Sequence, residues 1–288
     1  MKCIFCKSEK VYKNGNHNGK QGYKCKDCNK AFDYGKYTTK YINHFNVKIR
    51  SDDYDFLTRD NYCEPKSELC TERKNLLKKV KQQYDSNKSE SFKKLYKNYL
   101  FFPNEVFLDN EHYSSDYVEK HYKNCMENYD LNMKYFKSLD YDDFNSTLMS
   151  FVCKNKLKET DDISNLNFQG VYILVLDKYK QVYIGISNNI KRRIMSHWNN
   201  RKEFDRLVFG DVNTSIISID SFGPLDTTRI FYKEIKSVYK IDSFEKEYVK
   251  KFNSKYLLNR VDGGINSESD DKTRNLMLLG GIRKRIFK

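Results

Sequence analysis

Residues 170–185 have the sequence GVYILVLDKYKQVYIG, and this stretch decides the fold of the C-terminal half of the chain. It contains two short apolar runs with β-branched residues, Val171 to Leu176 and Val182 to Ile184. The polar segment Asp177 to Lys180 separates them and is typical of a turn. The pattern predicts an antiparallel hairpin.

A helix is predicted directly after the hairpin, because apolar residues recur at every fourth position, at Ile190, Ile194 and Trp198. Arg193 and His197 are four residues apart at the edge of this stripe, so they share one face of the helix. The hairpin would place Tyr172 and Tyr183 on neighbouring strands. Two hydroxyls, a guanidinium and an imidazole would therefore converge on one site.

The spacing of these motifs resembles that of the GIY-YIG nuclease family. Gly170-Val171-Tyr172, with Val in the middle, is followed after ten residues by Tyr183-Ile184-Gly185 and then by the Arg and His of the predicted helix. The family includes phage homing endonucleases, some restriction enzymes and the incision subunit of bacterial excision repair. The resemblance covers roughly residues 168–262. It implies a small α/β domain at 165–262, with a central antiparallel sheet flanked by helices.

The resemblance also implies six site residues, namely Tyr172, Tyr183, Arg193, His197, Glu245 and Asn259. Tyr172 would be the general base, and Arg193 would bind a phosphate oxygen, which suits the geometry of a guanidinium. Tyr183 and His197 would orient the water or the scissile phosphate. Glu245 would hold one divalent ion, Mg²⁺ or Mn²⁺, because a carboxylate suits a hard cation.

Two other interpretations of the acidic residues around position 245 stay open. Asp242 lies three residues before Glu245, which is the spacing of a helix capping box, and a Glu at that position serves only to close a helix end. Glu247 is the alternative metal ligand if the alignment with the family is shifted. The helix itself is predicted from an apolar stripe, formed by Phe244, Tyr248 and Phe252.

The region 203–241 contains two apolar runs where the resemblance needs one strand. Ser215–Ile219 and Arg229–Tyr232 are both predicted as strands. One of them would then belong to an insertion.

Two Cys-x-x-Cys pairs lie near the N-terminus, separated by 18 residues, and consist of Cys3, Cys6, Cys25 and Cys28. Two pairs at this separation match a four-cysteine structural zinc site, in which each tight turn brings two thiolates to one tetrahedral Zn²⁺. A segment of about 40 residues buries little core, so the metal would supply folding free energy. Redox-active pairs are the weaker interpretation, because nothing around them resembles a thioredoxin fold.

Two strands are predicted between the cysteine pairs, Val11–Gly15 and Gly19–Cys25, joined by a Gly/Asn turn with His17 exposed near it. Over about 30 residues, this segment resembles the zinc ribbon at the N-terminus of insertion-sequence transposases. The resemblance implies DNA binding. Phosphate contacts are expected among the lysines of the ribbon, at Lys13, Lys20, Lys24, Lys26 and Lys30.

The whole chain is predicted to be an α+β multidomain protein. A zinc ribbon at 1–40 precedes a mostly helical middle region at 41–164, the nuclease domain at 165–262 and a basic tail at 263–288. Helical periodicity in the middle region predicts a small helical core from the segments Leu69–Val80, Phe92–Leu100, Tyr117–Cys125 and Phe144–Val152. The remaining cysteines lack zinc-ligand pairing and are predicted to be structural or incidental, at Cys63, Cys70, Cys125 and Cys153.

The composition agrees with a nucleic-acid partner. A net charge of +14 and a pI of about 9.2 favour an anionic ligand, usually DNA or RNA. No apolar run is long enough for a membrane span, and no apolar signal-peptide core follows the N-terminus. A reducing compartment is therefore expected, such as the cytoplasm of a bacterial or phage-infected cell. The oligomeric state stays open.

These observations predict a metal-dependent DNA endonuclease that hydrolyses phosphodiester bonds and is targeted partly by the zinc ribbon. Homing, phage or mobile-element, restriction and repair roles are all compatible with the sequence. The alternative is a nucleic-acid-binding regulator with an inactive nuclease domain, against which the complete Tyr/Tyr/Arg/His/Glu set argues. RNA as the substrate also stays open, although the sequence has no RNA-recognition signature.

Overall fold

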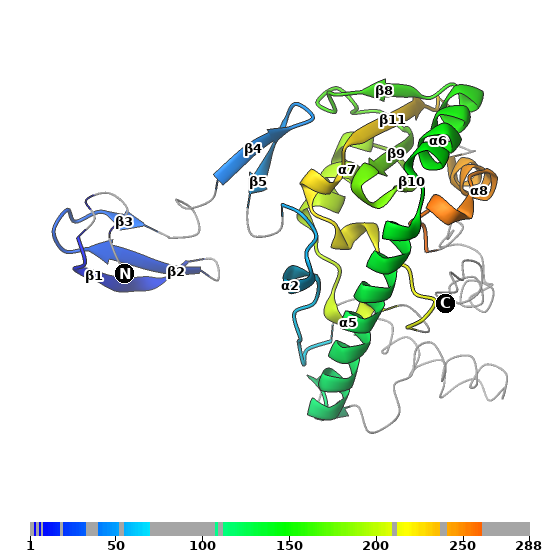
Figure 1. Cartoon of the computed structure of the whole chain (residues 1–288). Coiled ribbons are helices and arrows are strands. Elements are labelled where there is room, and N and C mark those ends of the chain that lie inside the picture. Colours follow the sequence, from blue (N-terminus) through cyan, green and yellow to red (C-terminus); the bar gives the residue numbers. More distant parts are fainter. Residues whose placement is uncertain are drawn as a thin grey trace, which may run out of the picture. The chain divides into compact units, whose positions relative to one another are not determined.

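The chain forms two compact units in the computed structural model, which describes residues 3, 6, 8–17, 20–32, 40–51, 55–69, 107–108, 112–208, 212–236 and 241–260. The first unit comprises Met1–Asn43 and Lys48–Asp53. The second unit comprises His44–Val47 and Tyr54–Lys288 and contains most of the helices and strands (Figure 1).

The first unit contains a three-stranded antiparallel sheet in the order β1-β2-β3, formed by β1 (Val11–His17), β2 (Lys20–Cys25) and β3 (Ala31–Phe32). The predicted hairpin of β1 and β2 is confirmed, although its turn at 18–19 and the side chain of His17 lie outside the described part of the chain. The small core consists of Cys3, Cys25 and Phe32, with Val11 and Tyr23 packed against it. Cysteine side chains thus make up much of what this sheet buries.

A second hairpin follows, formed by β4 (Lys40–His44) and β5 (Val47–Ser51). Phe45 and Asn46 form its two-residue turn with φ angles of 48° and 58°, the left-handed backbone that matches the twist of a tight hairpin. The carbonyl of Phe45 accepts a hydrogen bond from the backbone N–H of Ile163, at 3.0 Å. This contact explains why residues 44–47 belong to the second unit.

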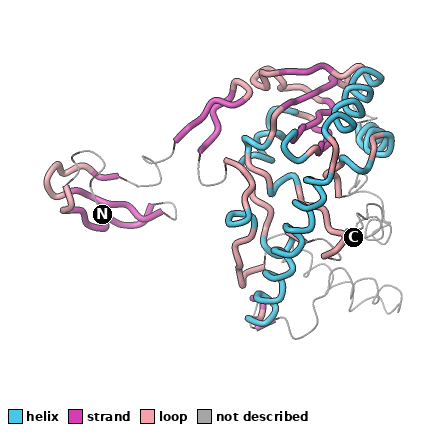
Figure 2. The backbone as a smooth tube through the Cα atoms, viewed as in Figure 1, coloured by secondary structure: helices cyan, strands magenta, loops and turns pink. Residues whose placement is uncertain are grey.

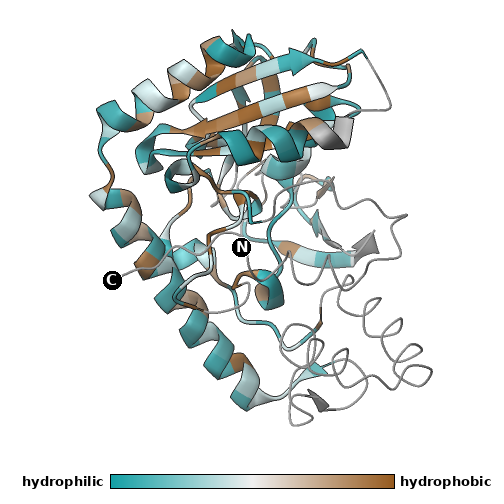
Figure 3. Ribbon diagram, turned by 90° about the vertical axis from the view of Figure 1, so that its right-hand side faces the viewer, coloured by the Kyte–Doolittle hydropathy of each residue, from teal (hydrophilic) through white to brown (hydrophobic). Residues whose placement is uncertain are grey.

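The second unit is built on a four-stranded antiparallel sheet in the order β10-β9-β11-β8. Its strands are β8 (Lys158–Thr160), β9 (Gly170–Leu176), β10 (Gln181–Ser187) and β11 (Arg229–Glu234). The predicted hairpin is confirmed as β9 and β10, with a short 3-10 turn at Asp177–Tyr179 between them. All seven residues of β9 are buried, and the central strands are hydrophobic along most of their length (Figure 3). The sheet therefore carries the core.

In Figure 2, helices of the second unit lie beside this sheet and extend below it. They are α2 (Arg59–Tyr62), α5 (Ser115–Ser138), α6 (Tyr141–Asn155), α7 (Ile190–Asn199) and α8 (Ile241–Lys251). The side chains of Ser114, Asp140 and Asn189 cap α5, α6 and α7 by accepting backbone N–H groups of the first turn. Within the part of the chain that the structure describes, no helix has the length and apolarity needed to cross a membrane.

The helices predicted at Tyr117–Cys125 and Phe144–Val152 are confirmed as parts of α5 and α6. The candidates at 70–80 and 92–100, with Cys70, lie outside the described residues, as does the tail at 263–288. Two short strands, β6 (Phe107–Leu108) and β7 (His112–Tyr113), pair just before α5.

The middle region contributes directly to the four-stranded sheet. Strand β8 lies before residue 165 and pairs with β11 at the sheet edge. Phe136 of α5 packs edge-on against Tyr179, and Phe151 of α6 packs edge-on against Tyr248 of α8. The helical middle region and the sheet therefore share one core.

The strand predicted at Ser215–Ile219 is wrong, and Arg229–Glu234 forms the strand β11 instead. The segment at 215–219 is irregular and buried, so its backbone groups need partners other than a neighbouring strand. The side-chain amides of Asn128 and Asn132 on α5 donate to the carbonyl of Ser215, at 2.8 and 2.9 Å. Side chains thus replace the strand ladder that the apolar pattern predicted.

Short 3-10 turns lie on either side of this segment, at Phe204–Arg206 before it and at Ile219–Ser221 and Pro224–Asp226 toward its end and beyond. A further 3-10 turn at Ser254–Tyr256 follows α8.

Candidate active site and metal centre

Tyr172 and Tyr183 lie on the same face of the β9–β10 hairpin. Tyr172 is paired with Gly185 across the strands, Tyr183 is two residues from Gly185, and the two ring centroids are 6.3 Å apart. A Cβ atom at Gly185 would overlap the Tyr172 hydroxyl and would lie 2.9 Å from the ring of Tyr183. Glycine is therefore required here because the backbone of β10 passes directly beside the two rings.

His197 lies on α7 and meets these tyrosines in the core. Its side chain is 2% exposed, and Nε2 lies 2.9 Å from the Tyr172 hydroxyl. The imidazole also stands edge-on to the Tyr183 ring, with centroids 5.0 Å apart. Helical periodicity explains this position, because Ile194 and Trp198 of the same helix are also buried.

Asp220 completes this cluster from the other side of the imidazole. Its Oδ1 lies 2.6 Å from Nδ1 of His197, and its Oδ2 lies 3.8 Å from Nζ of Lys202. Asp220 lies in the 3-10 turn Ile219–Ser221 and is not among the site residues predicted from the sequence. No local motif identifies it, since its partner is 23 residues away and the surrounding segment was predicted to be a strand.

The protonation states of this pair follow from burial and contact. Burial lowers the pKa of His197 below its ordinary value, and the opposing effect of Asp220 does not overcome it. Burial also raises the pKa of Asp220, but the hydrogen bond and charge of His197 outweigh this and hold the pKa below its ordinary value. At neutral pH the site therefore holds a neutral imidazole and an ionised carboxylate.

The tyrosine hydroxyls are held in their protonated form. Burial raises the pKa of Tyr172 well above its ordinary value, with a further rise from the charge of Glu245 and an opposing effect of Arg193. The pKa of Tyr183 is raised by the same causes. A base role for Tyr172 thus requires a nearby group that accepts its proton.

Glu245 and Arg193 belong to the same site, since each acts electrostatically on both tyrosines. Arg193 is exposed on α7, and Glu245 is half-buried on α8. Glu247 is exposed instead and pairs with Lys251, with 2.5 Å between Oε1 and Nζ. Helix α8 begins at Ile241, so Asp242 is its second residue and does not occupy the N-cap position that the capping-box interpretation requires.

These residues fit a single hard divalent ion. Glu245 is half-buried, and its charge acts on the hydroxyls of Tyr172 and Tyr183, as does the charge of Arg193. Mg²⁺ is commonly bound in this way, through one or two carboxylates together with phosphate oxygens.

Asn259 contacts the backbone of β10 rather than the tyrosine hydroxyls. Its Oδ1 accepts the backbone N–H of Ile184 at 3.0 Å, and its Nδ2 donates to the carbonyl of Ile184 at 2.7 Å. Asn259 is 3% exposed, so these two hydrogen bonds give both polar atoms of its buried amide a partner. Asn259 therefore positions β10 at Ile184, the residue between Tyr183 and Gly185.

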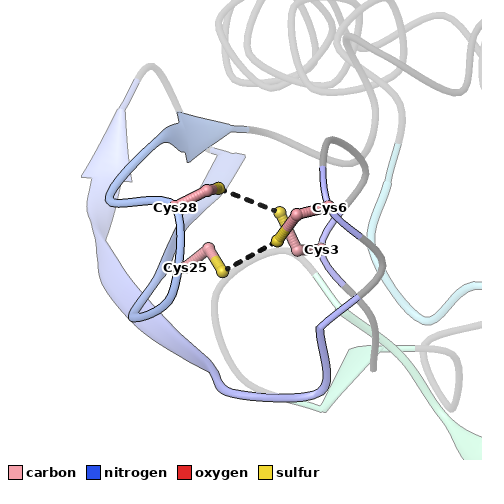
Figure 4. Close-up of side chains that lie close together, drawn as sticks. All are labelled: Cys3, Cys6, Cys25 and Cys28. Carbon is pink, nitrogen blue, oxygen red and sulfur yellow. Dashed lines mark hydrogen bonds between the residues drawn. The ribbon is translucent and has the colours of Figure 1, made fainter.

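The four N-terminal cysteines converge on one point (Figure 4). Their sulfur atoms all lie within 4.8 Å of one another, and the pairs Cys3–Cys28 and Cys6–Cys25 are 3.6 Å apart. A tetrahedron with Zn–S bonds of about 2.3 Å has S–S edges of about 3.8 Å, so the cluster has the size of a zinc site.

The second cysteine pair also has the backbone of a metal-binding turn. The N–H of Cys25 donates to the carbonyl of Lys30 at 3.1 Å, and Asn29 after the pair is left-handed, with φ of 56°. The tight turn directs both thiols to the same side. This four-cysteine cluster could therefore hold a metal ion, and its soft, tetrahedral ligand set suits Zn²⁺.

Comparison with known families identifies residues 168–257 as similar to the GIY-YIG catalytic domain. Among curated proteins and among solved structures, no match to this chain is found. The family match supports a GIY-YIG domain in the second unit and, with it, a nuclease activity of the endonuclease kind, and such nucleases use divalent metals.

Proposed function

We propose that this protein is a metal-dependent DNA endonuclease whose site consists of Tyr172, Tyr183, Arg193, His197 and Glu245. The observation that carries the proposal is the contact of Tyr172 with His197, at 2.9 Å, next to Tyr183 and within the electrostatic reach of Arg193 and Glu245. These groups come from two strands and two helices, and they lie within the region that matches the GIY-YIG domain.

Hydrolysis of a phosphodiester needs a deprotonated water and stabilised charge on the phosphate. Tyr172 takes the proton of the attacking water, and Tyr183 orients that water beside it. The guanidinium of Arg193 binds a phosphate oxygen through charge-assisted hydrogen bonds. Asn259 keeps β10 in register so that Tyr183 stays in place.

Glu245 would hold a divalent ion, Mg²⁺ or Mn²⁺. When bound, such an ion polarises the phosphate and stabilises the charge that develops during hydrolysis. Glu245 is the better candidate than Glu247, because the charge of Glu245 reaches both tyrosines whereas Glu247 pairs with Lys251.

The N-terminal unit would be a DNA-binding zinc ribbon. The size of the sulfur tetrahedron supports Zn²⁺, and exposed lysines on the ribbon supply positive charge for phosphates, among them Lys13, Lys26 and Lys30. The ribbon would thereby help to target cleavage, as in a homing, phage or mobile-element, or restriction enzyme.

The test is cleavage of plasmid DNA by the full chain, with and without Mg²⁺, beside Glu245→Ala and Glu247→Ala. We expect nicking or linearisation that requires metal, disappears in Glu245→Ala and persists in Glu247→Ala. Loss of cleavage in Glu247→Ala but not in Glu245→Ala would identify Glu247 as the metal ligand. Tight, salt-sensitive DNA binding without cleavage by the wild type would overturn the endonuclease in favour of a regulator with an inactive nuclease domain.

A parallel test with single-stranded and double-stranded RNA of the same sequence determines whether the substrate is DNA or RNA. We expect DNA to be cut and RNA to be left intact. Cleavage of RNA alone would contradict the DNA assignment.

A further inference from the structure

Asp220, His197 and Tyr172 form a continuous chain of hydrogen bonds. Asp220 Oδ1 lies 2.6 Å from His197 Nδ1, and His197 Nε2 lies 2.9 Å from the Tyr172 hydroxyl. The imidazole is 2% exposed, so water does not compete freely for either nitrogen. Both ring nitrogens are therefore committed to protein partners.

The ionised carboxylate of Asp220 determines the direction of both hydrogen bonds, from His197 to Asp220 and from Tyr172 to His197. An ionised carboxylate only accepts hydrogen bonds, so Nδ1 of His197 must donate to Asp220. In a neutral imidazole the other nitrogen then carries a lone pair, so Nε2 accepts and the Tyr172 hydroxyl donates. This order orients the phenolic hydrogen toward His197, so the phenolic oxygen acts as an acceptor toward its other neighbour, the side chain of Arg193.

Hydrogen bonds to the backbone hold Asp220 and the segment before it in position. The hydroxyl of Ser218 accepts the backbone N–H of Asp220 at 3.4 Å, and the backbone N–H of Lys202 donates to the carbonyl of Asp220 at 3.1 Å. The segment before it is anchored from two directions, by the amides of α5 at Ser215 and by Arg260, whose Nε donates to the carbonyl of Ile216 at 2.7 Å. Helix α5 and the chain after α8 thus hold the carboxylate against the imidazole.

We propose that Asp220 is a positioning residue for the hydrolysis, which fixes His197 as the Nδ1–H tautomer so that Nε2 receives the Tyr172 proton. This inference rests on the proposed endonuclease function. As the oxygen of water bonds to phosphorus, its proton passes to the Tyr172 oxygen while the phenolic proton passes to Nε2. The bond from phosphorus to the leaving oxygen breaks, that oxygen takes a proton from solvent, and the imidazolium beside Asp220 later returns one to solvent.

Asp220→Asn is the informative substitution. Lys202 lies beside Oδ2, so the amide oxygen is expected to stay toward Lys202 and the amide N–H₂ to face Nδ1 of His197. In that arrangement the imidazole carries its proton on Nε2, so Nε2 no longer accepts the proton of Tyr172. We expect the maximal cleavage rate to fall on the order of 100-fold or more, the range of a lost general-base contribution, with little change in KM and in the Mg²⁺ concentration needed.

Two controls separate positioning from folding. Asp205→Asn removes another buried carboxylate, which lies in the 3-10 turn Phe204–Arg206 and accepts from the Tyr113 hydroxyl at 2.7 Å. We expect it to lower stability without changing the maximal rate of the folded protein. Asp220→Glu keeps a carboxylate and should restore part of the activity that Asp220→Asn loses.

The second readout is independent of cleavage. In protein with ¹⁵N-labelled histidines, the nitrogen shifts of His197, assigned with His197→Gln, should show Nδ1–H in the wild type and Nε2–H in Asp220→Asn. Wild-type cleavage by Asp220→Asn, or Nε2–H in the wild type, would overturn the role of Asp220. A wild type that cleaves no nucleic acid would overturn the proposed function, while the ¹⁵N shifts would still decide the tautomer.

Discussion

The side-chain amide of Asn259 binds both backbone groups of Ile184, as a neighbouring strand would. Ile184 N–H donates to Oδ1 at 3.0 Å and Ile184 C=O accepts from Nδ2 at 2.7 Å. Ile184 separates Tyr183 from Gly185, so this pair of bonds fixes the part of β10 on which both tyrosines depend. A residue at the C-terminal end of the domain thereby holds the hairpin in place.

Asn259→Ala should therefore weaken both the fold and the site. It leaves two buried backbone groups of Ile184 without their partner, which costs about 2–3 kcal/mol of unfolding free energy. Urea unfolding followed by the fluorescence of Trp198, the single tryptophan of the chain, measures this. Asn259→Asp should be at least as unstable, since its carboxylate does not donate to the Ile184 carbonyl. Wild-type stability in both variants would contradict the role of Asn259.

Gly185→Ala and Gly170→Ala should fail in different ways. At Gly185 the added methyl group overlaps the Tyr172 hydroxyl, so cleavage should fall by at least about tenfold while most of the stability remains. At Gly170 the methyl group overlaps the backbone carbonyl of Lys233, which belongs to β11, so the sheet itself should lose stability. Equal effects of the two substitutions on stability would show that crowding by Tyr172 is not the reason for a glycine at position 185.

Zinc should be present at one ion per chain in protein purified without chelator. Cys25→Ser should remove it and reduce DNA affinity at low salt, because the ribbon loses its folding free energy. The unfolding midpoint reported by Trp198 should stay unchanged, since the cysteine cluster and Trp198 belong to separate compact units. Cys153→Ser, an exposed cysteine outside the cluster, is the matched control and should retain the metal. Zinc retained in Cys25→Ser would exclude a four-thiolate site.

Stability should decrease between pH 7.5 and 5.5, partly through His44. Burial lowers the pKa of His44, whose Nε2–H donates to the carbonyl of Thr227 at 3.1 Å. Between that lowered pKa and the unfolded value of about 6.5, the unfolded chain binds more protons, so stability rises with pH and is lost on acidification.

His44→Gln tests this sign. Its amide still donates to Thr227, but it does not titrate, so its unfolding midpoint should fall less than that of the wild type over the same pH interval. The ring of His44 lies 5.2 Å from that of Trp198, so the same fluorescence measurement follows both. A larger fall in His44→Gln than in the wild type would contradict the neutral, buried state of His44.

The local parts of the fold could be predicted from the sequence, because each follows from periodicity or from short spacing. Two apolar runs around a polar turn predicted β9 and β10, and a four-residue apolar repeat predicted α7. The spacing of two Cys-x-x-Cys pairs predicted the cysteine cluster. In these cases the contacts that matter lie within one hairpin, one helix or two tight turns.

The remaining features depend on contacts between distant segments. The apolar run at 215–219 predicted a strand, but its backbone groups are bound by side chains of α5 and by Arg260, which no local pattern reveals. The same anchoring places Asp220 against His197, and Asn259 replaces a strand beside Ile184. Buried polar groups must find partners wherever the folded chain provides them, so these pairings exist only once the tertiary structure has brought the segments together.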